Sequence, residues 1–144
     1  MIETKRFSLV KPTIQTPFHI DFDWWREHDS NWKVYLFSYL CTEHQAAFQN
    51  TDQDAKIDWV DPVTAEVFVV DGLEHTLMRH CALEPGFLTR NTSLVDAVFR
   101  SFLKNGNKPL TPQELSEITG KTAVTILTTF SGPTIYKGIR PVQK

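Results

Sequence analysis

The chain has 144 residues, of which 41% are apolar and 12% aromatic, and its formal net charge is −2. This composition supplies a core for one ordinary domain or two small modules, and it excludes an intrinsically disordered chain. No apolar run reaches the roughly 18–20 residues that span a bilayer, and the first residues lack the apolar stretch of a secretory signal. We therefore expect a cytoplasmic protein without a membrane partner. Its two cysteines are too few for a disulfide scaffold, so we expect free thiols or metal ligands.

Charge is distributed unevenly along the chain. Residues 1–92 contain 8 Lys/Arg and 14 Asp/Glu, a balance of −6, whereas residues 93–144 contain 7 and 3, a balance of +4. An asymmetry of this kind suggests that the C-terminal part contacts a polyanion. The alternative is that this part docks against an acidic surface, for which the acidic half of the same chain would serve.

The first 90 residues predict a small mixed module. Residues 13–22 alternate as an extended segment, in which Pro17 favours an edge strand or a turn. Residues 32–40 are almost entirely apolar and indicate a buried helix, with a central strand as the alternative that periodicity leaves open. A hairpin and a helix capped by Asp71 are expected to follow, with strands over 57–60 and 66–70 and the helix over about 72–82.

The unusual chemistry of this module lies in its cysteines and histidines. Cys41 and His44 have the Cys-x2-His spacing of a common zinc half-site, because both side chains can turn onto one ion. His80 and Cys81 could complete a Cys2His2 tetrahedron, although neighbours on a helix point about 100° apart, so at most one histidine there (His75 or His80) fits easily. Structural zinc held by Cys41, His44, His80 and Cys81 is one interpretation. Two buried thiols that act as packing residues are the other.

Three helices are expected beyond about residue 91, and the first covers about 94–104. Ser93 can cap it, and its apolar residues recur with the i, i+3, i+4 and i+7 spacing of one buried stripe. The Asn-Gly-Asn run at 105–107 ends this helix, because glycine and asparagine accept the left-handed conformation that terminates helices.

The second and third helices are short, over about 112–119 and 122–131. Thr111 and Glu114 form a capping box, with proline at the first helical position. Gly120 stands where a left-handed residue ends the second helix. Two extended pieces, 134–136 and 139–142, are then expected to form a ribbon around the Lys-Gly pair at 137–138.

This order of helix, short capped helix, glycine turn, helix and ribbon resembles a winged helix-turn-helix domain, with 108–110 as its first strand. Within it, residues 115–127 resemble the helix-turn-helix consensus of many bacterial regulators. Ser116 is the small residue after the first core leucine, Gly120 makes the turn, and Ile126 anchors the recognition helix. The resemblance is confined to the C-terminal third of the chain and extends to no part of residues 1–92. It implies a DNA-binding fold, although winged domains also serve as protein docking units.

The candidate DNA-contacting residues lie on the third helix and in the ribbon. Threonines at outward positions can bond phosphates and contact thymine methyl groups, whereas the usual base-reading Arg, Asn and Gln are missing from this helix. Basic residues in the ribbon suit phosphate contacts. The candidates are Lys121, Thr122, Thr125, Thr128, Lys137 and Arg140.

We therefore predict an α+β protein with a mixed module over 1–90 and a winged helix-turn-helix domain over 91–144. The predicted function is that of a DNA-binding regulator that contacts duplex DNA mainly through the phosphate backbone, with homodimerisation left open. The alternative is a non-catalytic adaptor subunit that uses the winged domain to dock onto protein in a larger complex. The sequence has no phosphate-binding glycine loop, nucleophile elbow or zinc-protease motif, so we do not expect an enzyme.

Overall fold

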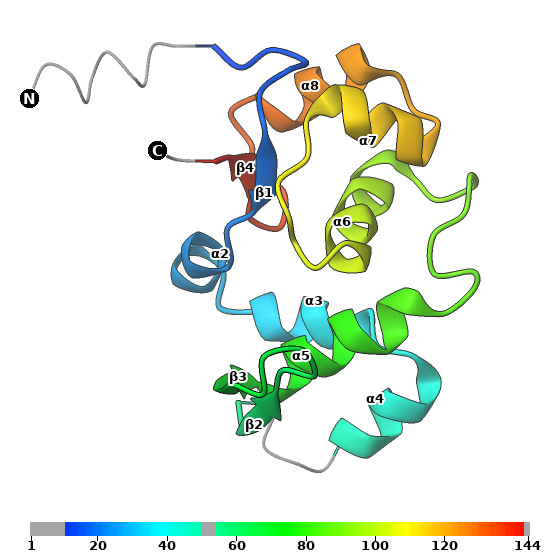
Figure 1. Ribbon diagram of the computed structural model, residues 1–144. Coiled ribbons are helices and arrows are strands. Elements are labelled where there is room, and N and C mark those ends of the chain that lie inside the picture. The colour runs from blue at the N-terminus through cyan, green and yellow to red at the C-terminus, as the bar shows by residue number, and fades with distance from the viewer. Residues whose placement is uncertain (1–10, 50–53, 143–144) are drawn as a thin grey trace, which may run out of the picture. The chain divides into compact units, whose positions relative to one another are not determined.

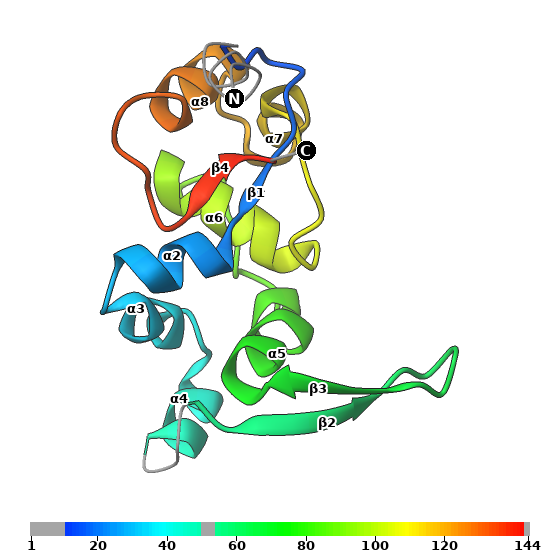
Figure 2. The same ribbon diagram turned by 90° about the vertical axis from the view of Figure 1, so that its left-hand side faces the viewer.

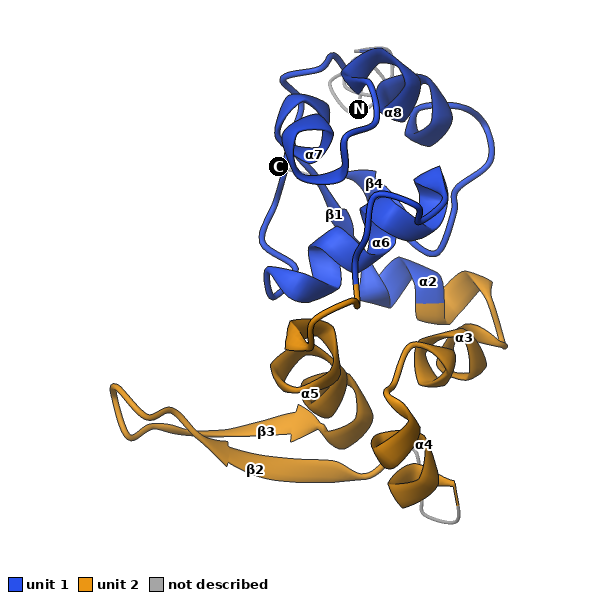
Figure 3. Cartoon of the chain, turned by 90° about the vertical axis from the view of Figure 1, so that its right-hand side faces the viewer, with its two compact units in different colours: residues 1–25, 88–144 blue, residues 26–87 orange. Residues whose placement is uncertain are grey.

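A computed structural model describes residues 11–49 and 54–142, and Figure 1 and Figure 2 show it from two sides. Helices and two small antiparallel sheets make up these residues, which confirms the predicted α+β class. The chain divides into two compact units: residues 1–25 and 88–144 form unit 1, and residues 26–87 form unit 2 (Figure 3). Among the described residues, no helix combines the length and the apolar character that a membrane span requires.

The division into units differs from the predicted domains at the N-terminus. The predicted boundary near residue 90 lies close to the junction at 87–88, but residues 1–25 group with the C-terminal part. The reason is strand pairing, because β1 (Phe18–Ile20) runs antiparallel to β4 (Ile139–Pro141), with Ile20 opposite Ile139. Unit 2 is therefore an insertion in the sequence of unit 1, entered through α2 (Phe22–His28).

Unit 1 is built on three helices: α6 (Leu94–Lys104), α7 (Pro112–Thr119) and α8 (Ala123–Phe130). Each lies within one residue of its predicted bounds. The capping box of α7 is present, since the Glu114 N–H donates to the Thr111 hydroxyl at 3.1 Å and the Thr111 N–H donates to the Glu114 carboxylate at 2.9 Å. The helices enclose an apolar core with β1, β4 and α2, whose largest buried side chains include Phe18, Trp25, Phe99, Phe102, Leu115 and Ile126.

The run that ends α6 also holds β1 in place. Asn107 has φ +62°, which fits its predicted role as a left-handed helix stop. Its side-chain amide then makes two hydrogen bonds to Ile20, accepting from the Ile20 N–H and donating to the Ile20 carbonyl, both at 2.9 Å. A residue predicted only to stop a helix therefore also fixes the N-terminal strand.

The expected ribbon within 134–142 does not form, and this prediction is corrected. The strand β4 is present at 139–141, but its partner is β1 rather than residues 134–136. On its other side β1 exchanges backbone hydrogen bonds with Leu110, from Phe18 N–H to Leu110 O at 2.8 Å and from Leu110 N–H to Phe18 O at 3.1 Å. The N-terminal strand thus lies between the two pieces that the sequence predicted to belong to one C-terminal sheet.

Unit 2 contains five further regular elements and one short 3-10 helix. They are α3 (Trp32–Ser38), α4 (Thr42–Phe48), β2 (Lys56–Val60), β3 (Val67–Asp71), α5 (Gly72–Arg79) and η1 (Cys81–Leu83). The apolar segment at 32–40 is thus mainly helical, as predicted, and not the alternative strand. The prediction that this helix is buried is wrong, because within α3 only Leu36 is buried while Val34 and Tyr35 are exposed. The predicted hairpin is present, and Figure 2 shows β2 and β3 side by side.

One face of the hairpin is held by aromatic contacts to α5. Trp59 and Phe68 lie opposite each other and stack, with ring centroids 6.0 Å apart. From α5, the Arg79 guanidinium lies 4.5 Å from the Trp59 ring centroid and the His75 ring lies 5.3 Å from it. The alternate residues of the hairpin carry exposed β-branched side chains, which are Val60, Val67 and Val69.

Candidate metal centre and helix-turn-helix surface

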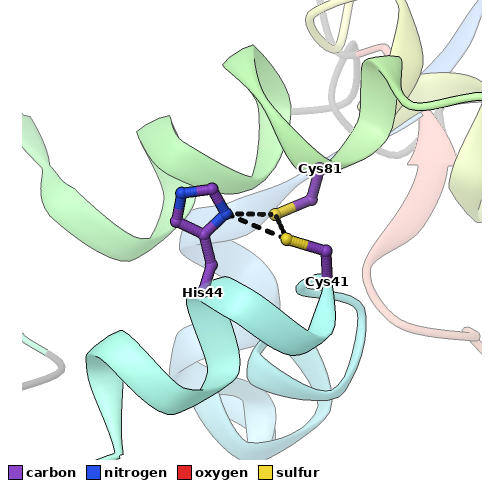
Figure 4. Close-up of side chains that lie close together, drawn as sticks. All are labelled: Cys41, His44 and Cys81. Atoms are coloured by element: carbon purple, nitrogen blue, oxygen red, sulfur yellow. Dashed lines mark hydrogen bonds between the residues drawn. The ribbon is translucent and has the colours of Figure 1, made fainter.

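Cys41, His44 and Cys81 converge within unit 2 (Figure 4). The Cys41 sulfur lies 3.0 Å from Nδ1 of His44, the Cys81 sulfur lies 3.4 Å from the same nitrogen, and the two sulfurs are 3.5 Å apart. A tetrahedral zinc ion, with Zn–S of about 2.3 Å and Zn–N of about 2.0–2.1 Å, holds such ligand atoms about 3.6–3.8 Å apart. The three atoms therefore need outward shifts of only a few tenths of an ångström to accept one ion.

The first two candidate ligands come from one turn of helix. Cys41 is the residue before α4, with an extended backbone at φ −67° and ψ 163°, and His44 lies in the first turn of α4. This placement turns both side chains to the same side, as the Cys-x2-His spacing predicts. The third ligand depends on where α5 ends, which the sequence did not reveal.

Cys81 reaches the cluster because the backbone leaves the helical conformation after α5. The helix predicted over 72–82 ends at Arg79, and His80 leaves the helical conformation with φ −124° and ψ −65°. Cys81 then begins η1 and is 2% exposed. Its side chain points at the sulfur of Cys41 and the ring of His44, as Figure 4 shows.

The structure thus brings together three of the four predicted ligands. His80 is exposed and contributes no atom to the cluster; its ring lies beside that of His44, with centroids 5.5 Å apart and 30° between the planes. His75, the alternative ligand, contacts Trp59 of the hairpin instead. The backbone break at His80 accompanies this arrangement, because Cys81 follows it in η1 with its side chain toward Cys41, whereas His75 lies earlier, within α5.

Burial affects the protonation of one member of the cluster, Cys81. It raises the pKa of the Cys81 thiol to about 11, and the neighbouring Cys41 and Glu84 contribute to this rise. At neutral pH this sulfur therefore carries a proton that a metal ion must displace, which is the usual coupling between thiolate ligation and proton release. The pKa of His75, outside the cluster, is lowered by burial and by the nearby Arg79 and His80.

The second candidate surface is the helix-turn-helix of unit 1. Gly120 ends α7 with φ +78°, as predicted for the turn. The Ser116 hydroxyl donates to the Lys121 carbonyl at 2.5 Å. The small residue of the consensus therefore also links the end of α7 to the turn that follows it. Thr122 caps α8 by accepting from the Thr125 N–H at 3.3 Å.

The outward face of α8 is neutral in charge. Thr122, Thr125 and Thr128 are exposed there together with Val124, and Lys121 is half-buried just before the helix. The Thr122 hydroxyl donates to the Thr125 hydroxyl at 2.6 Å, which leaves the face polar but already partly hydrogen-bonded.

The two candidates of the expected ribbon lie in a turn and a strand, as predicted, but the strand pairs with β1 instead of with residues 134–136. Lys137 has φ +51° in the turn before β4, and Arg140 lies in β4 itself. Arg140 forms an ion pair with Asp21 at 3.5 Å, and its guanidinium lies 5.5 Å from the ring centroid of Trp24. Sequence reasoning missed these two partners because the pairing of β1 with β4 brings them to Arg140 from the other end of the chain.

The division into units sharpens the charge asymmetry. Unit 1 contains 11 Lys/Arg and 6 Asp/Glu, a balance of +5, whereas unit 2 contains 4 and 11, a balance of −7. Part of the positive charge of unit 1 is paired within the unit. Arg100 on α6 forms an ion pair with Asp96 at 2.9 Å, and Arg140 forms the ion pair with Asp21.

Comparison with known protein families, with curated proteins and with solved structures gave no match for this chain.

Proposed function

We propose that the protein binds zinc through Cys41, His44 and Cys81. The observation that carries this proposal is the convergence of two sulfurs and one imidazole nitrogen within 3.5 Å of one another. Cysteine sulfur and imidazole nitrogen are the ligands that zinc prefers. Cys41 and Cys81 are 40 positions apart in the sequence. A metal ion bound to both would close the long loop between them, which stabilises a fold by restricting the unfolded chain.

The role we propose for the metal is structural. The helix α4 buries no residue of its own, so the apolar core of unit 2 does little to hold it. Its start carries Cys41 and His44, and an ion shared with Cys81 would attach this helix to the end of α5. Small modules often add a structural metal where the apolar core is thin, and the binding free energy then becomes folding free energy.

The test is metal analysis of the full-length protein with ligand and control variants. Protein produced with zinc in the medium should contain about one equivalent of the ion, because structural sites bind tightly. Cys41→Ser and Cys81→Ser should lose the ion. His75→Ala is the matched control, since it removes a histidine of the same unit that contacts Trp59 instead of the cluster. A metal-free preparation that melts cooperatively and does not respond to chelator would contradict the proposal.

We further propose that unit 1 binds duplex DNA, as a cytoplasmic regulator would. The proposal is supported by α7 and α8 joined through the left-handed Gly120, by the exposed threonines of α8, and by the balance of +5. With Arg100 and Arg140 held in ion pairs, phosphate contacts would come from the lysines, from the exposed Arg90 beside Gly120, and from backbone and hydroxyl donors.

A salt titration of DNA binding tests this proposal. For about four phosphate contacts, affinity should fall by about two orders of magnitude between about 50 and 200 mM salt. Lys121→Ala and Lys137→Ala should weaken binding to all sequences and flatten the salt dependence, whereas Thr128→Val should change sequence preference. Lys56→Ala, an exposed lysine of unit 2, removes the same charge and should leave binding unchanged.

A protein adaptor is the second candidate, and one observation favours it. Ile118 on α7 and Val124 on α8 are both exposed, while two arginines of the unit are paired with Asp96 and Asp21. Exposed apolar side chains on both helices, together with a neutral face on α8, suit contact with protein better than contact with phosphates. A titration without any binding to mixed-sequence duplex at about 50 mM salt would contradict the DNA proposal and favour the adaptor.

A further inference from the structure

The same cluster holds a pair of thiols that are close enough to react with each other. The sulfurs of Cys41 and Cys81 lie 3.5 Å apart, and the Cys81 thiol donates to the Cys41 sulfur. A disulfide needs an S–S distance of about 2.05 Å, so the two sulfurs must approach by about 1.5 Å. Both residues border short elements, α4 and η1, in which such a shift displaces few buried groups.

The two cysteines differ in their exposure to solvent. Cys41 is half-buried, whereas Cys81 is 2% exposed. A small oxidant therefore reaches Cys41 first. Nδ1 of His44, at 3.0 Å from the Cys41 sulfur, is placed to accept the thiol proton as the sulfur reacts.

We propose that Cys41 is an oxidation site for hydroperoxides and that the product is an intramolecular Cys41–Cys81 disulfide. The disulfide depends only on the placement of the two sulfurs, while its consequence for the metal rests on the proposed zinc centre.

The reaction proceeds in two balanced steps. The Cys41 sulfur attacks the terminal oxygen of the hydroperoxide, the O–O bond breaks, and the alkoxide leaves as an alcohol after taking up the proton from Cys41. The Cys81 sulfur then attacks the resulting sulfenic acid at Cys41, an S–S bond forms, and the S–O bond breaks. The hydroxide that leaves takes the proton of Cys81 and departs as water. Two thiols and one hydroperoxide thus become one disulfide, one alcohol and one water.

This oxidation and metal binding exclude each other. Zinc needs both sulfurs as thiolates, and a disulfide supplies neither, which leaves His44 as the single remaining ligand of the cluster. Oxidation should therefore release the ion and detach the start of α4. The cluster would then connect the redox state of the compartment to the order of unit 2.

The test treats full-length protein with hydrogen peroxide, first after removal of metal with chelator and then loaded with zinc. In metal-free protein both free thiols should disappear, and non-reducing peptide mapping should show one peptide pair joined through Cys41 and Cys81 in a monomeric chain. The Cys81→Ser variant should stop at a sulfenic acid on Cys41 that a cyclic 1,3-dione traps. The Cys41→Ser variant should keep its Cys81 thiol, and circular dichroism checks that both variants are folded.

The outcomes separate this inference from the zinc proposal. If purified protein never holds zinc but forms the disulfide, the zinc proposal fails and the oxidation site stands. If zinc-loaded protein releases one equivalent of ion as the disulfide appears, both are supported. The inference is overturned if metal-free protein keeps both thiols under peroxide while Cys81→Ser forms the sulfenic acid. The inference is also overturned if the disulfides that form join two chains, or if Cys41 does not react with peroxide in either the wild type or the Cys81→Ser variant.

Discussion

Gly138 is a glycine of unit 1 whose surroundings leave little room for a side chain. It has φ +76° in the turn before β4, and a Cβ there would lie 2.9 Å from the Cβ of Trp25 and 3.0 Å from the carbonyl oxygen of Asp21. The Asp21 N–H also donates to the Gly138 carbonyl at 2.8 Å. Close packing of this turn on the start of α2 is thus what requires glycine.

Gly138→Ala should therefore destabilise unit 1 more than Gly106→Ala does. Both positions have positive φ, which costs an alanine on the order of 1 kcal/mol, but nothing lies within 4 Å of a Cβ at Gly106. The clash at Gly138 should add about 1–3 kcal/mol. Denaturant unfolding of the two variants measures the difference, and equal losses would show that the turn can move away from α2.

Glu74 on α5 should make the stability of unit 2 depend on pH. Burial raises the pKa of this carboxyl above its ordinary value of 4.5, Asp71 raises it further, and Lys33 acts in the opposite direction. The folded state thus holds the proton more tightly than the unfolded state does. This contribution is fully present below pH 4.5 and is lost as pH rises through the raised value.

Replacing Glu74 with glutamine should accordingly stabilise the protein at neutral pH and flatten the dependence of stability on pH above 4.5. Urea unfolding of wild type and variant at several pH values measures this. Glu66→Gln serves as the control, because Glu66 is an exposed acid of the same unit. A wild type and a Glu74→Gln variant with parallel profiles would mean that the carboxyl is solvated.

Among the helices of unit 1, two N-caps have the same backbone conformation and different side-chain bonding. Thr111 and Ser93 both have extended φ and ψ, but the Thr111 hydroxyl accepts from the N–H of Glu114, whereas Ser93 makes no side-chain capping bond. Thr111→Ala should cost about 1 kcal/mol of stability, and Ser93→Ala should cost only a few tenths. Thermal unfolding compares them, and a Ser93 loss as large as the Thr111 loss would contradict the assignment.

The elements that the sequence predicted well are those whose signals are local. The bounds of α6, α7 and α8 follow from caps, stop residues and apolar spacing within one helix length. The pairing of Cys41 with His44 follows in the same way from a three-residue spacing. The partner of β4 and the ion pair of Arg140 could not be predicted, because both depend on β1 from the other end of the chain. The position of Cys81 in the cluster depends on the backbone break at His80, which no pattern in this segment predicts.

For the whole molecule, the metal should matter to one unit more than to the other. All three converging ligands belong to unit 2, whereas unit 1 has its own buried residues around α6. Chelator should therefore speed hydrogen exchange in peptides from 26–87 while peptides from 94–130 keep their protection. Mass-resolved exchange of the full-length protein measures this. Equal loss of protection in both sets would show that the two units unfold as one.

The pairing of β1 with β4 also fixes an order of events during synthesis. About 120 residues separate the paired strands, which is roughly 6–24 s of translation at about 5–20 residues per second. Unit 2 is one continuous stretch and is synthesised within that interval, whereas the sheet of unit 1 needs β4, which follows unit 2 in the sequence. A nascent chain that stops before Ile139 leaves Phe18 and Ile20, each 1% exposed in the finished protein, without β4 beside them. The strand β1 is thus synthesised before unit 2, and its pairing with β4 can form only after unit 2 has been synthesised.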